Sequence, residues 1–316
     1  MVKRAFLFPG QGSQALGMGK DLAENFAEAR AVFEEVNDAL AQDLTAIMWG
    51  EDEAALNLTE NTQPALMAVS MAVVKVLEGQ GGLSVAKACS YVAGHSLGEY
   101  SALTAAGSLK LADTARLLKI RGTSMQKAVP VGVGSMAAIL GLDLPDVEAI
   151  AKDASNSHIV EAANDNSDGQ VVVSGHKAAV EAAVALTTER GAKRAVILPV
   201  SAPFHCRLMQ PAAVAMQEAL EAAEVNAPSV PVIANVTAAP VTDPAEIVQL
   251  LVEQVTGMVR WRESVIALKG LGVEQAAELG SGKVLCGLVR RIEKDIECLN
   301  AGTPAEIEAL ITAMKG

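Results

Sequence analysis

Aromatic side chains are scarce in this chain. They account for 3% of its 316 residues, whereas hydrophobic residues as a whole account for 51%. Alanine, valine and leucine therefore supply most of the hydrophobic content. A chain of this length can bury a large core and is too long for one small domain. Aliphatic runs with few aromatic residues favour helices packed on a buried parallel sheet, so we expect an α/β fold.

Positive charge is also in deficit. The 25 Lys and Arg residues are outnumbered by 37 Asp and Glu residues, which gives a formal net charge of −12. Because nucleic acids are held mainly through their phosphates by basic surfaces, this balance argues against a nucleic-acid partner. No run of about 18 apolar residues is free of charge and glycine, so we expect no membrane-spanning helix.

Cysteine is rare, and its spacing matches no zinc-ligand pattern. The four cysteines form no C-x-x-C pair and are scattered at Cys89, Cys206, Cys286 and Cys298. We expect four buried thiols in a reducing compartment, and no metal site. The apolar run at the N-terminus stops at Pro9 and is too short for a signal peptide, so the sequence predicts a cytoplasmic protein.

The most informative segment is Gly94-His95-Ser96-Leu97-Gly98. An apolar run over residues 88–93 precedes it and a helix-compatible segment over 99–106 follows it. This strand–turn–helix order is the context in which G-x-S-x-G forms a nucleophile elbow. The glycines let strand and helix approach closely, and the amide of Leu97 would point to where an oxyanion forms. The alternative is a tight turn whose serine only caps the helix.

A second glycine-rich segment, Gly10-Gln11-Gly12-Ser13-Gln14, follows a short buried strand. With Ala15 it fits the G-x-G-x-x-G/A fingerprint of dinucleotide sites. That fingerprint requires a second strand, whereas residues 21–42 repeat apolar side chains at helical spacing. We therefore expect no nicotinamide cofactor, and a loop whose backbone amides face the same cleft as Ser96.

A serine nucleophile requires a base, and the chain has only four histidines. His95 adjoins Ser96 on the elbow, so its side chain should diverge from that of the serine. We expect structural roles for His158 and His176. His205 lies in a loop where the chain re-enters the core, which favours a Ser96–His205 dyad; the alternative is a histidine packed beside Phe204. No acid of the α/β-hydrolase order serine–acid–histidine stands out before His205.

The middle of the chain has an order of its own. After a glycine-rich hinge over residues 130–134, strands and helices alternate as β-α-β-β-α-β, with residues 164–169 as a polar turn between the middle strands. This is the split βαβ pattern. We therefore predict an α/β-hydrolase-like core with a parallel sheet over residues 1–130 and 201–316, interrupted by an inserted ferredoxin-like small domain over residues 131–200.

The core segments show the same alternation. Upstream of the elbow, a buried helix over 65–77 is expected to begin with Thr62 as its N-cap and Pro64 in its first turn. A helix over 111–127 follows the elbow. After the insertion we expect strands over 230–236 and 275–279 and helices over 209–223, 245–255, 261–269 and 283–291.

Several motifs occur together in a fixed order, and they cover essentially the whole chain. They are Phe8-Pro9-Gly10-Gln11-Gly12-Ser13-Gln14, Thr62-Gln63-Pro64-Ala65, Gly94-His95-Ser96-Leu97-Gly98-Glu99, Arg121-Gly122 with Met125-Gln126, Phe204-His205, and Glu278-Leu279-Gly280. Because it carries all of these motifs in this order, the chain closely resembles the malonyl-CoA:acyl-carrier-protein transacylases of bacterial fatty-acid synthesis. It is also similar to the acyltransferase domains of polyketide synthases. Where the family often has proline, this chain has Gly280-Ser281-Gly282.

The resemblance implies transfer of a malonyl group from malonyl-CoA to the phosphopantetheine thiol of an acyl carrier protein, by a ping-pong route that supplies extender units. Ser96 would carry the malonyl ester and His205 would act as base. The amides of Gln11 and Leu97 would form the oxyanion hole. The backbone carbonyl of Gln254 would orient His205, which would account for the missing acid.

The resemblance also implies substrate-binding residues. Arg121 would bind the malonyl carboxylate, Gln63 would line the pocket and Phe204 would narrow it. Independently, a free carboxylate on the acyl group calls for a bidentate partner, and the planar fork of arginine supplies one. Without the resemblance, Arg121 would be a solvated helix arginine.

The resemblance implies malonyl-CoA and an acyl carrier protein as partners, and no metal or redox cofactor. Because such carriers are acidic, a locally basic docking face is expected, with Lys283, Arg290 and Arg291 as candidates. We expect a monomer. Two other function classes remain: a serine esterase or thioesterase with the same dyad, and a carrier-binding module without activity.

Overall fold

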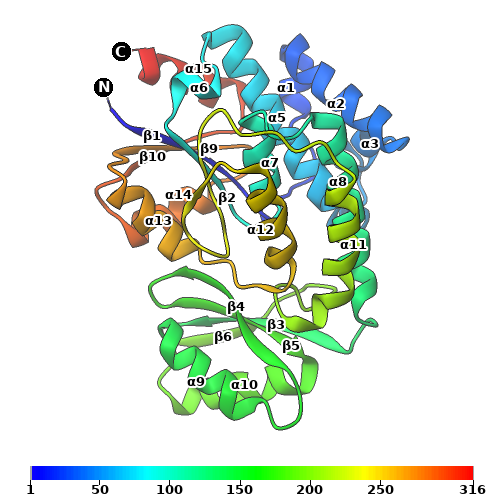
Figure 1. The fold of residues 1–316 in the computed structure, drawn as a ribbon, viewed down its shortest axis with the longest axis vertical. Helices are drawn as coiled ribbons and strands as arrows, with labels where there is room; N and C mark the ends of the chain where they lie inside the picture. Colours follow the sequence, from blue (N-terminus) through cyan, green and yellow to red (C-terminus); the bar gives the residue numbers. More distant parts are fainter. Residues whose placement is uncertain (1, 316) are drawn as a thin grey trace.

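Strand β1 (Arg4–Phe8) lies inside a six-stranded sheet with the order β10-β9-β1-β2-β7-β8 (Figure 1). The structure is a computed structural model that describes residues 2–315. Strands β1, β2, β7, β9 and β10 pair in parallel, and β8 pairs with β7 antiparallel. Leu7 and Phe8 are fully buried, as expected for a parallel sheet covered on both faces. The other strands of this sheet are β2 (Tyr91–Gly94), β7 (Val232–Ile233), β8 (Pro240–Val241), β9 (Gln275–Leu279) and β10 (Glu297–Ala301).

Helices surround this sheet (Figure 1). The most buried is α5 (Thr59–Gly81), whose aliphatic side chains point into the core on nearly every side. The others are α1 (Lys20–Asn25), α2 (Ala27–Leu40), α3 (Leu44–Trp49), α4 (Glu53–Asn57), α6 (Val85–Ala88), α7 (Gly98–Ala105), α8 (Leu111–Ala128), the 3-10 turn η1 (Arg207–Met209), α11 (Gln210–Glu221), α12 (Pro244–Thr256), α13 (Trp261–Gly270), α14 (Val284–Ile292) and α15 (Pro304–Lys315).

A separate four-stranded sheet has the order β4-β5-β3-β6, and all its pairs are antiparallel. Two helices cover its outer face, at the bottom of Figure 1, and its other face is directed at the rest of the molecule. Its elements are β3 (Gly134–Leu140), α9 (Leu144–Ala154), β4 (Val160–Ser167), β5 (Gln170–His176), α10 (Lys177–Glu189) and β6 (Arg194–Ile197). The mixed α/β class and the order of these six elements agree with the sequence prediction.

The predicted polar turn over residues 164–169 is wrong. Strand β4 continues through Ser167, with irregular pairing at residues 162–167, and only Asp168 and Gly169 form the turn. The polar side chains are buried because they face the larger part of the molecule: Asn164 is 7% exposed and Asp165 is 1% exposed. Val259 forms a parallel bridge with Asn164, so the strand has a neighbour on this side as well.

Helix starts and ends also differ from expectation. Helix α5 begins at Thr59, so Thr62 is not its N-cap and Pro64 lies inside the helix. The hydroxyl of Thr62 donates instead to the backbone carbonyl of Leu56 at 2.6 Å. The predicted helix over residues 21–42 is divided at Phe26, whose φ of −129° is extended. The strand predicted over residues 230–236 is limited to β7.

Two of the four expected thiols are absent. Cys286 and Cys298 form a disulfide between α14 and β10, with a Cα–Cα distance of 5.3 Å, while Cys89 and Cys206 are free and buried. Elements β10 and α15 were not predicted from the sequence. Over residues 2–315, none of the helices is both long and apolar enough to cross a membrane. Met1 and Gly316, at the ends of the predicted core, lie outside the described residues.

Candidate active site

The segment 94–98 joins strand β2 to helix α7 in a very tight turn. A Cβ atom on Gly94 would lie 1.9 Å from the backbone of Gly98, and one on Gly98 would lie 2.2 Å from the carbonyl oxygen of Phe8. Ser96, at the apex, has a φ of 55°, a left-handed conformation that is uncommon for residues other than glycine. The strand–turn–helix arrangement predicted for this motif is therefore present, and its serine occupies a strained backbone position.

His205 is the histidine that reaches Ser96. Its Nε2 lies 2.7 Å from Ser96 Oγ, and its Nδ1 lies 2.9 Å from the carbonyl oxygen of Gln254 and 3.2 Å from that of Gly257. Two carbonyl acceptors require a proton on Nδ1, which leaves Nε2 free to accept from the serine hydroxyl. His205 also has a left-handed backbone, with a φ of 57°.

The imidazole of His205 is held in its neutral form. Burial and, next in size, the positive charge of Arg121 lower the pKa of His205 to about 3, against the hydrogen bonds from its ring to the carbonyls of Gln254 and Gly257. A neutral imidazole beside a serine hydroxyl can accept its proton at physiological pH.

Arg121 lies on α8 and is 1% exposed. Its Nη1 donates to Gln63 Oε1 at 2.8 Å, and its Nη2 donates to Ser96 Oγ at 3.1 Å and to Gln254 Oε1 at 2.9 Å. Its Nε has no hydrogen-bond partner among the described residues. Burial lowers the pKa of the guanidinium, which nevertheless stays charged because arginine does not lose its proton in proteins.

A buried carboxylate lies behind these residues. Glu99 Oε2 accepts from the backbone N–H of Asn235 at 3.0 Å and from Gln254 Nε2 at 2.8 Å. Burial raises the pKa of Glu99 to about 7, against these hydrogen bonds and the charge of Arg121. Asn235 Oδ1 in turn accepts from the backbone N–H of Ser96 at 2.7 Å. Sequence reasoning missed both Glu99 and Asn235.

One signal could have identified Asn235. It is a lone polar residue two positions after the end of the apolar strand β7, at the edge of the sheet where β2 also ends. Carboxyl ends of neighbouring parallel strands carry functional side chains in open α/β sheets. Glu99 offers a weaker signal, because an acidic residue in the first turn of a helix is equally expected for a solvated helix.

A cavity of about 110 Å³ brings the predicted residues together. Its lining includes the predicted set Gln11, Gln63, Ser96, Leu97, Arg121, Phe204 and His205. Gln254 does not line it and lies directly behind. His95 does line it, but its Nε2 contacts Asn166 Oδ1 at 2.8 Å rather than the serine, so its side chain diverges as expected.

The remaining two histidines are remote from this cavity. His176, at the end of β5, and His158, in the bend before β4, lie against each other with ring centroids 5.2 Å apart. His176 Nδ1 accepts from the backbone N–H of Ile159 at 2.9 Å. Within residues 2–315, no group of three or more His, Cys, Asp or Glu side chains could hold a metal ion. The groups gathered at Ser96 can instead perform acyl transfer through a covalent ester.

Comparisons with known proteins agree with this chemistry. A malonyl CoA-acyl carrier protein transacylase of Escherichia coli (strain K12) is 44% identical over 315 residues, which cover 100% of each chain. A protein of the same name from Bacillus subtilis (strain 168) is 43% identical over 316 residues, 100% of this chain and 98% of its own length.

Solved structures give the same result. An acyl-carrier-protein S-malonyltransferase from Bartonella henselae superposes with a TM-score of 0.97 at 57% identity, covering 99% of this chain and 100% of that one. A malonyl-transacylase solved in complex with its type II PKS acyl-carrier protein superposes with a TM-score of 0.95 at 42% identity, covering 98% and 99%. The family model described as an acyl transferase domain matches residues 5–278. The chain therefore belongs to the acyl transferase domain family.

Proposed function

We propose that this enzyme transfers a malonyl group from malonyl-CoA to the phosphopantetheine thiol of an acyl carrier protein, through an ester on Ser96. The names of its full-length relatives support the donor and the acceptor. Transfer of this kind supplies extender units for fatty-acid synthesis. The reaction needs no redox cofactor or metal, because each half-reaction exchanges one acyl acceptor for another.

In the first half-reaction, Ser96 Oγ attacks the thioester carbonyl carbon while His205 Nε2 takes the hydroxyl proton. The carbonyl oxygen becomes an oxyanion, and the backbone N–H groups of Gln11 and Leu97 are the donors that we assign to it. No hydrogen bond within residues 2–315 uses either N–H, which supports this assignment. As the C–S bond breaks, the imidazolium of His205 returns the proton to the leaving CoA thiolate.

The second half-reaction reverses these steps with a different thiol. His205 takes the proton of the carrier's phosphopantetheine thiol, and the sulfur attacks the ester carbonyl carbon. The C–O bond to Ser96 breaks and its oxygen recovers the proton from His205. Donor and acceptor carry the same pantetheine arm, so one cavity serves both halves.

The single observation that carries the malonyl assignment is the burial of Arg121 next to the nucleophile. Arg121 is 1% exposed, and its Nη2 lies 3.1 Å from Ser96 Oγ. A buried cation at the reacting centre suits an acyl group that ends in a carboxylate, which arginine binds through two parallel hydrogen bonds. Gln63 supports Arg121 from one side of the cavity, and Phe204 is assigned to narrow the cavity against branched acyl groups.

We infer that the two sheets correspond to the two predicted domains. Residues 1–130 and 201–316 would form an α/β-hydrolase-like core, and residues 131–200 a ferredoxin-like small domain. The β-α-β-β-α-β order and the antiparallel pairing of the four-stranded sheet support the second assignment. The parallel sheet with Ser96 after β2 supports the first.

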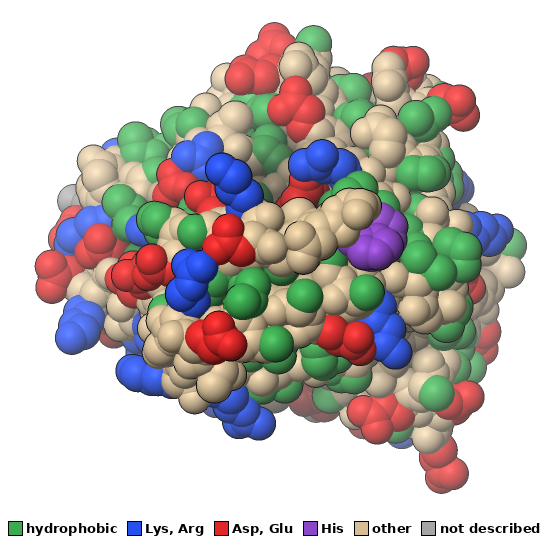
Figure 2. Space-filling model, turned by 90° about the horizontal axis from the view of Figure 1, so that it is seen from below, with side chains coloured by type: hydrophobic (Ala, Val, Ile, Leu, Met, Phe, Trp, Pro, Cys, Tyr) green, Lys and Arg blue, Asp and Glu red, His purple; other side chains and the backbone are tan. Residues whose placement is uncertain are grey.

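The carrier docking face is assigned to basic side chains at and before helix α14. Lys283, Arg290 and Arg291 are exposed there, and Arg291 Nη1 donates to Gln170 Oε1 at 2.8 Å, so this face adjoins the four-stranded sheet. The face formed by α9 and α10 is less suited, because its acidic and basic side chains are interspersed (Figure 2). A monomeric state, a cytoplasmic location and the absence of a nucleic-acid partner stay predictions from the sequence.

The test is acylation in the absence of carrier. The protein is incubated with malonyl-CoA or acetyl-CoA, quenched with acid and measured by intact mass, and the modified peptide is sequenced. We expect a malonyl adduct on the peptide that contains Ser96, and little acetyl adduct. Steady release of free CoA without an adduct would indicate a thioesterase, and neither adduct nor release would indicate a binding module.

Two variants complete the test. Ser96→Ala should abolish the adduct, whereas Ser90→Ala, before the start of β2, should form it normally. A malonyl adduct that survives in Ser96→Ala would overturn the assignment of the nucleophile.

A further inference from the structure

We propose that the ion pair between Asp165 and Arg262 holds strand β4 of the four-stranded sheet against helix α13. Arg262 is thereby a positioning residue for acyl transfer. Arg262 does not line the cavity around Ser96. It acts through strand β4, whose residues on either side of Asp165 do reach the active site. The inference rests on the proposed function for its kinetic part only.

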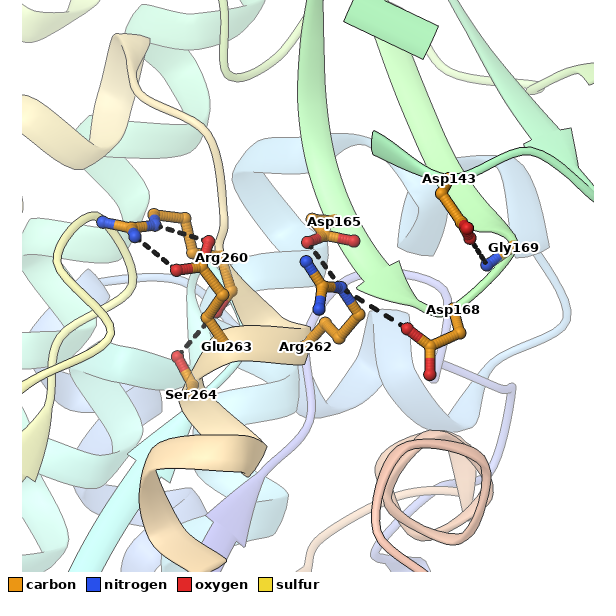
Figure 3. Close-up of polar contacts among 8 residues, drawn as sticks. All are labelled: Asp143, Asp165, Asp168, Gly169, Arg260, Arg262, Glu263 and Ser264. Atoms are coloured by element: carbon orange, nitrogen blue, oxygen red, sulfur yellow. Dashed lines mark hydrogen bonds and ion pairs between the residues drawn. The ribbon is translucent and has the colours of Figure 1, made fainter. Parts of the chain in front are cut away.

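The ion pair crosses between two parts of the fold (Figure 3). Arg262 Nε, in the first turn of α13, lies 2.9 Å from Asp165 Oδ2, near the end of β4, and 3.8 Å from Asp168 Oδ1, in the turn that follows β4. The Asp165 side chain is 1% exposed and that of Arg262 is 26% exposed. A carboxylate this buried needs its partner, because an uncompensated charge is costly in a dry environment.

Backbone hydrogen bonds accompany the ion pair. The N–H of Asp165 donates to the carbonyl oxygen of Val259 at 3.0 Å, and the N–H of Val259 donates to that of Ala163 at 2.9 Å. Val259 therefore extends the four-stranded sheet at its β4 edge by one parallel bridge, just before α13 begins. A single bridge is a weak connection, so the ion pair beside it contributes strongly to keeping β4 in contact with the start of α13.

The neighbours of Asp165 connect the contact to the active site. Asn164 lines the cavity around Ser96, and Asn166 Oδ1 meets His95 Nε2 at 2.8 Å, on the residue before the nucleophile. Three consecutive residues of β4 thus contact the cavity, Arg262 and the elbow. A shift of β4 away from α13 would move a cavity wall and release His95, and displacements of about 1 Å cost catalysis up to about 100-fold.

Burial also leaves Asp165 under-satisfied. Its Oδ1 has no hydrogen-bond partner among the described residues, and burial raises its pKa while Arg262 lowers it. Removing Arg262 would leave the carboxylate with neither a charge partner nor full hydrogen bonding. A variant that removes both charges should be less damaged than one that removes the arginine alone.

A matched control lies on the same turn of α13. Arg260 and Glu263 form an ion pair that points away from β4 (Figure 3), with about a third of each side chain exposed. Glu263→Gln removes this pair without a contact to the four-stranded sheet, and it takes a negative charge away from the surroundings of Asp165, so it should not weaken the Asp165–Arg262 pair. The test set is therefore Arg262→Gln, Arg262→Lys, the double variant Asp165→Asn/Arg262→Gln, and Glu263→Gln.

The first readout is amide hydrogen exchange, which needs no activity. In Arg262→Gln, the N–H groups of Asp165 and Val259 should exchange about tenfold faster or more, while amides of β1 and β9 keep their rates. Glu263→Gln should leave all of these unchanged. Unchanged exchange at Asp165 and Val259 in Arg262→Gln would overturn the inference, whatever reaction the enzyme performs.

The second readout is malonyl transfer, measured under conditions where urea unfolding shows every variant to be folded. Arg262→Gln should lose about 10- to 100-fold in kcat/KM. Arg262→Lys keeps the positive charge but not the planar guanidinium group, so it should lose less. The double variant Asp165→Asn/Arg262→Gln should recover part of the loss. Equal kcat/KM for Arg262→Gln and Glu263→Gln would show that the Asp165–Arg262 ion pair does not affect acyl transfer, and Arg262 would not be a positioning residue. Absence of malonyl transfer in the unmodified enzyme would instead overturn the proposed function.

Discussion

Gln254 Nε2 donates to Glu99 Oε2 at 2.8 Å, and this contact determines which end of the Gln254 amide faces the active site. With its NH2 group directed at the carboxylate, Gln254 presents Oε1 to Arg121 Nη2 at 2.9 Å. The same residue offers its backbone carbonyl to His205. One glutamine on α12 thus orients both the base and the guanidinium, and Glu99 orients the glutamine.

Glu99→Gln tests the ionisation of the buried carboxyl. Burial raises the pKa of Glu99 to about 7 from its ordinary value of 4.5, so between these pH values the folded state holds a proton that the unfolded state has lost. The stabilisation is complete below about pH 4.5 and is lost as pH rises through 7. The difference is on the order of 3 kcal/mol.

Glutamine imitates the protonated acid and cannot titrate. We therefore expect the free energy of unfolding of Glu99→Gln, relative to the unmodified protein, to increase between pH 5 and pH 8. Urea unfolding at several pH values measures it. A difference that does not change with pH would show that Glu99 keeps an ordinary pKa.

Gln254→Ala separates the two functions of that residue. The backbone carbonyl that accepts from His205 Nδ1 remains, while the side-chain contacts to Arg121 and Glu99 are lost. We expect kcat/KM for malonyl-CoA to fall about 10- to 100-fold, because the guanidinium loses one of its fixed positions and Glu99 loses a donor. Steady-state kinetics with both acyl donors measures the effect.

Gln249→Ala is the matched control for this variant. Gln249 lies on the same helix, is exposed, and donates only to Glu253 at 2.9 Å. Its replacement should leave kcat/KM unchanged. Full activity in Gln254→Ala would mean that Arg121 is held sufficiently by Gln63 alone.

The candidate active site could be predicted from the sequence where short motifs carry it, and not where distant residues complete it. Ser96 is fixed by the glycines around it, and His205 is the histidine left once the others are placed by their segments. Glu99 and Asn235 were missed because their importance arises from contacts across 136 residues of chain, from the Asn235 backbone N–H to the Glu99 carboxylate. The spacing of hydrophobic residues along the chain does not predict such contacts.

The largest error in the fold has the same cause. Residues 164–167 are polar, so sequence patterns favour a turn, yet they form the end of β4. Their burial is possible because Val259 supplies backbone partners and Arg262 supplies a counter-charge. Both partners come from almost 100 residues downstream, and local propensity was overridden by tertiary contacts.

Gly94→Ala tests the close approach of strand and helix at the elbow. The added Cβ would lie 1.9 Å from the carbonyl carbon and oxygen of Gly98. Because these are backbone atoms, the backbone itself would have to move to remove the clash. We expect destabilisation of at least about 3 kcal/mol, measured by urea unfolding. Gly287→Ala is the control, because a Cβ there has no neighbour within 4 Å and lies in helix α14. It should stabilise the protein by about 0.5–1 kcal/mol.

Arg121→Ala should change both specificity and the pH profile. Without the guanidinium the malonyl carboxylate has no counter-charge, so kcat/KM for malonyl-CoA should fall about 100-fold or more, and that for acetyl-CoA much less. Equal losses for the two donors would remove Arg121 from substrate recognition.

The pH profile reports on the base. Arg121 is the second cause, after burial, of the lowered pKa of His205, because a nearby positive charge disfavours the imidazolium. Its removal should raise the pKa of His205 from about 3 towards, but not above, the ordinary value of 6.5, since burial persists. In acetyl transfer, the acid limb of kcat/KM should therefore move to higher pH in Arg121→Ala. If the acid limb of kcat/KM lies at the same pH in Arg121→Ala as in the unmodified enzyme, Arg121 does not affect the protonation of His205.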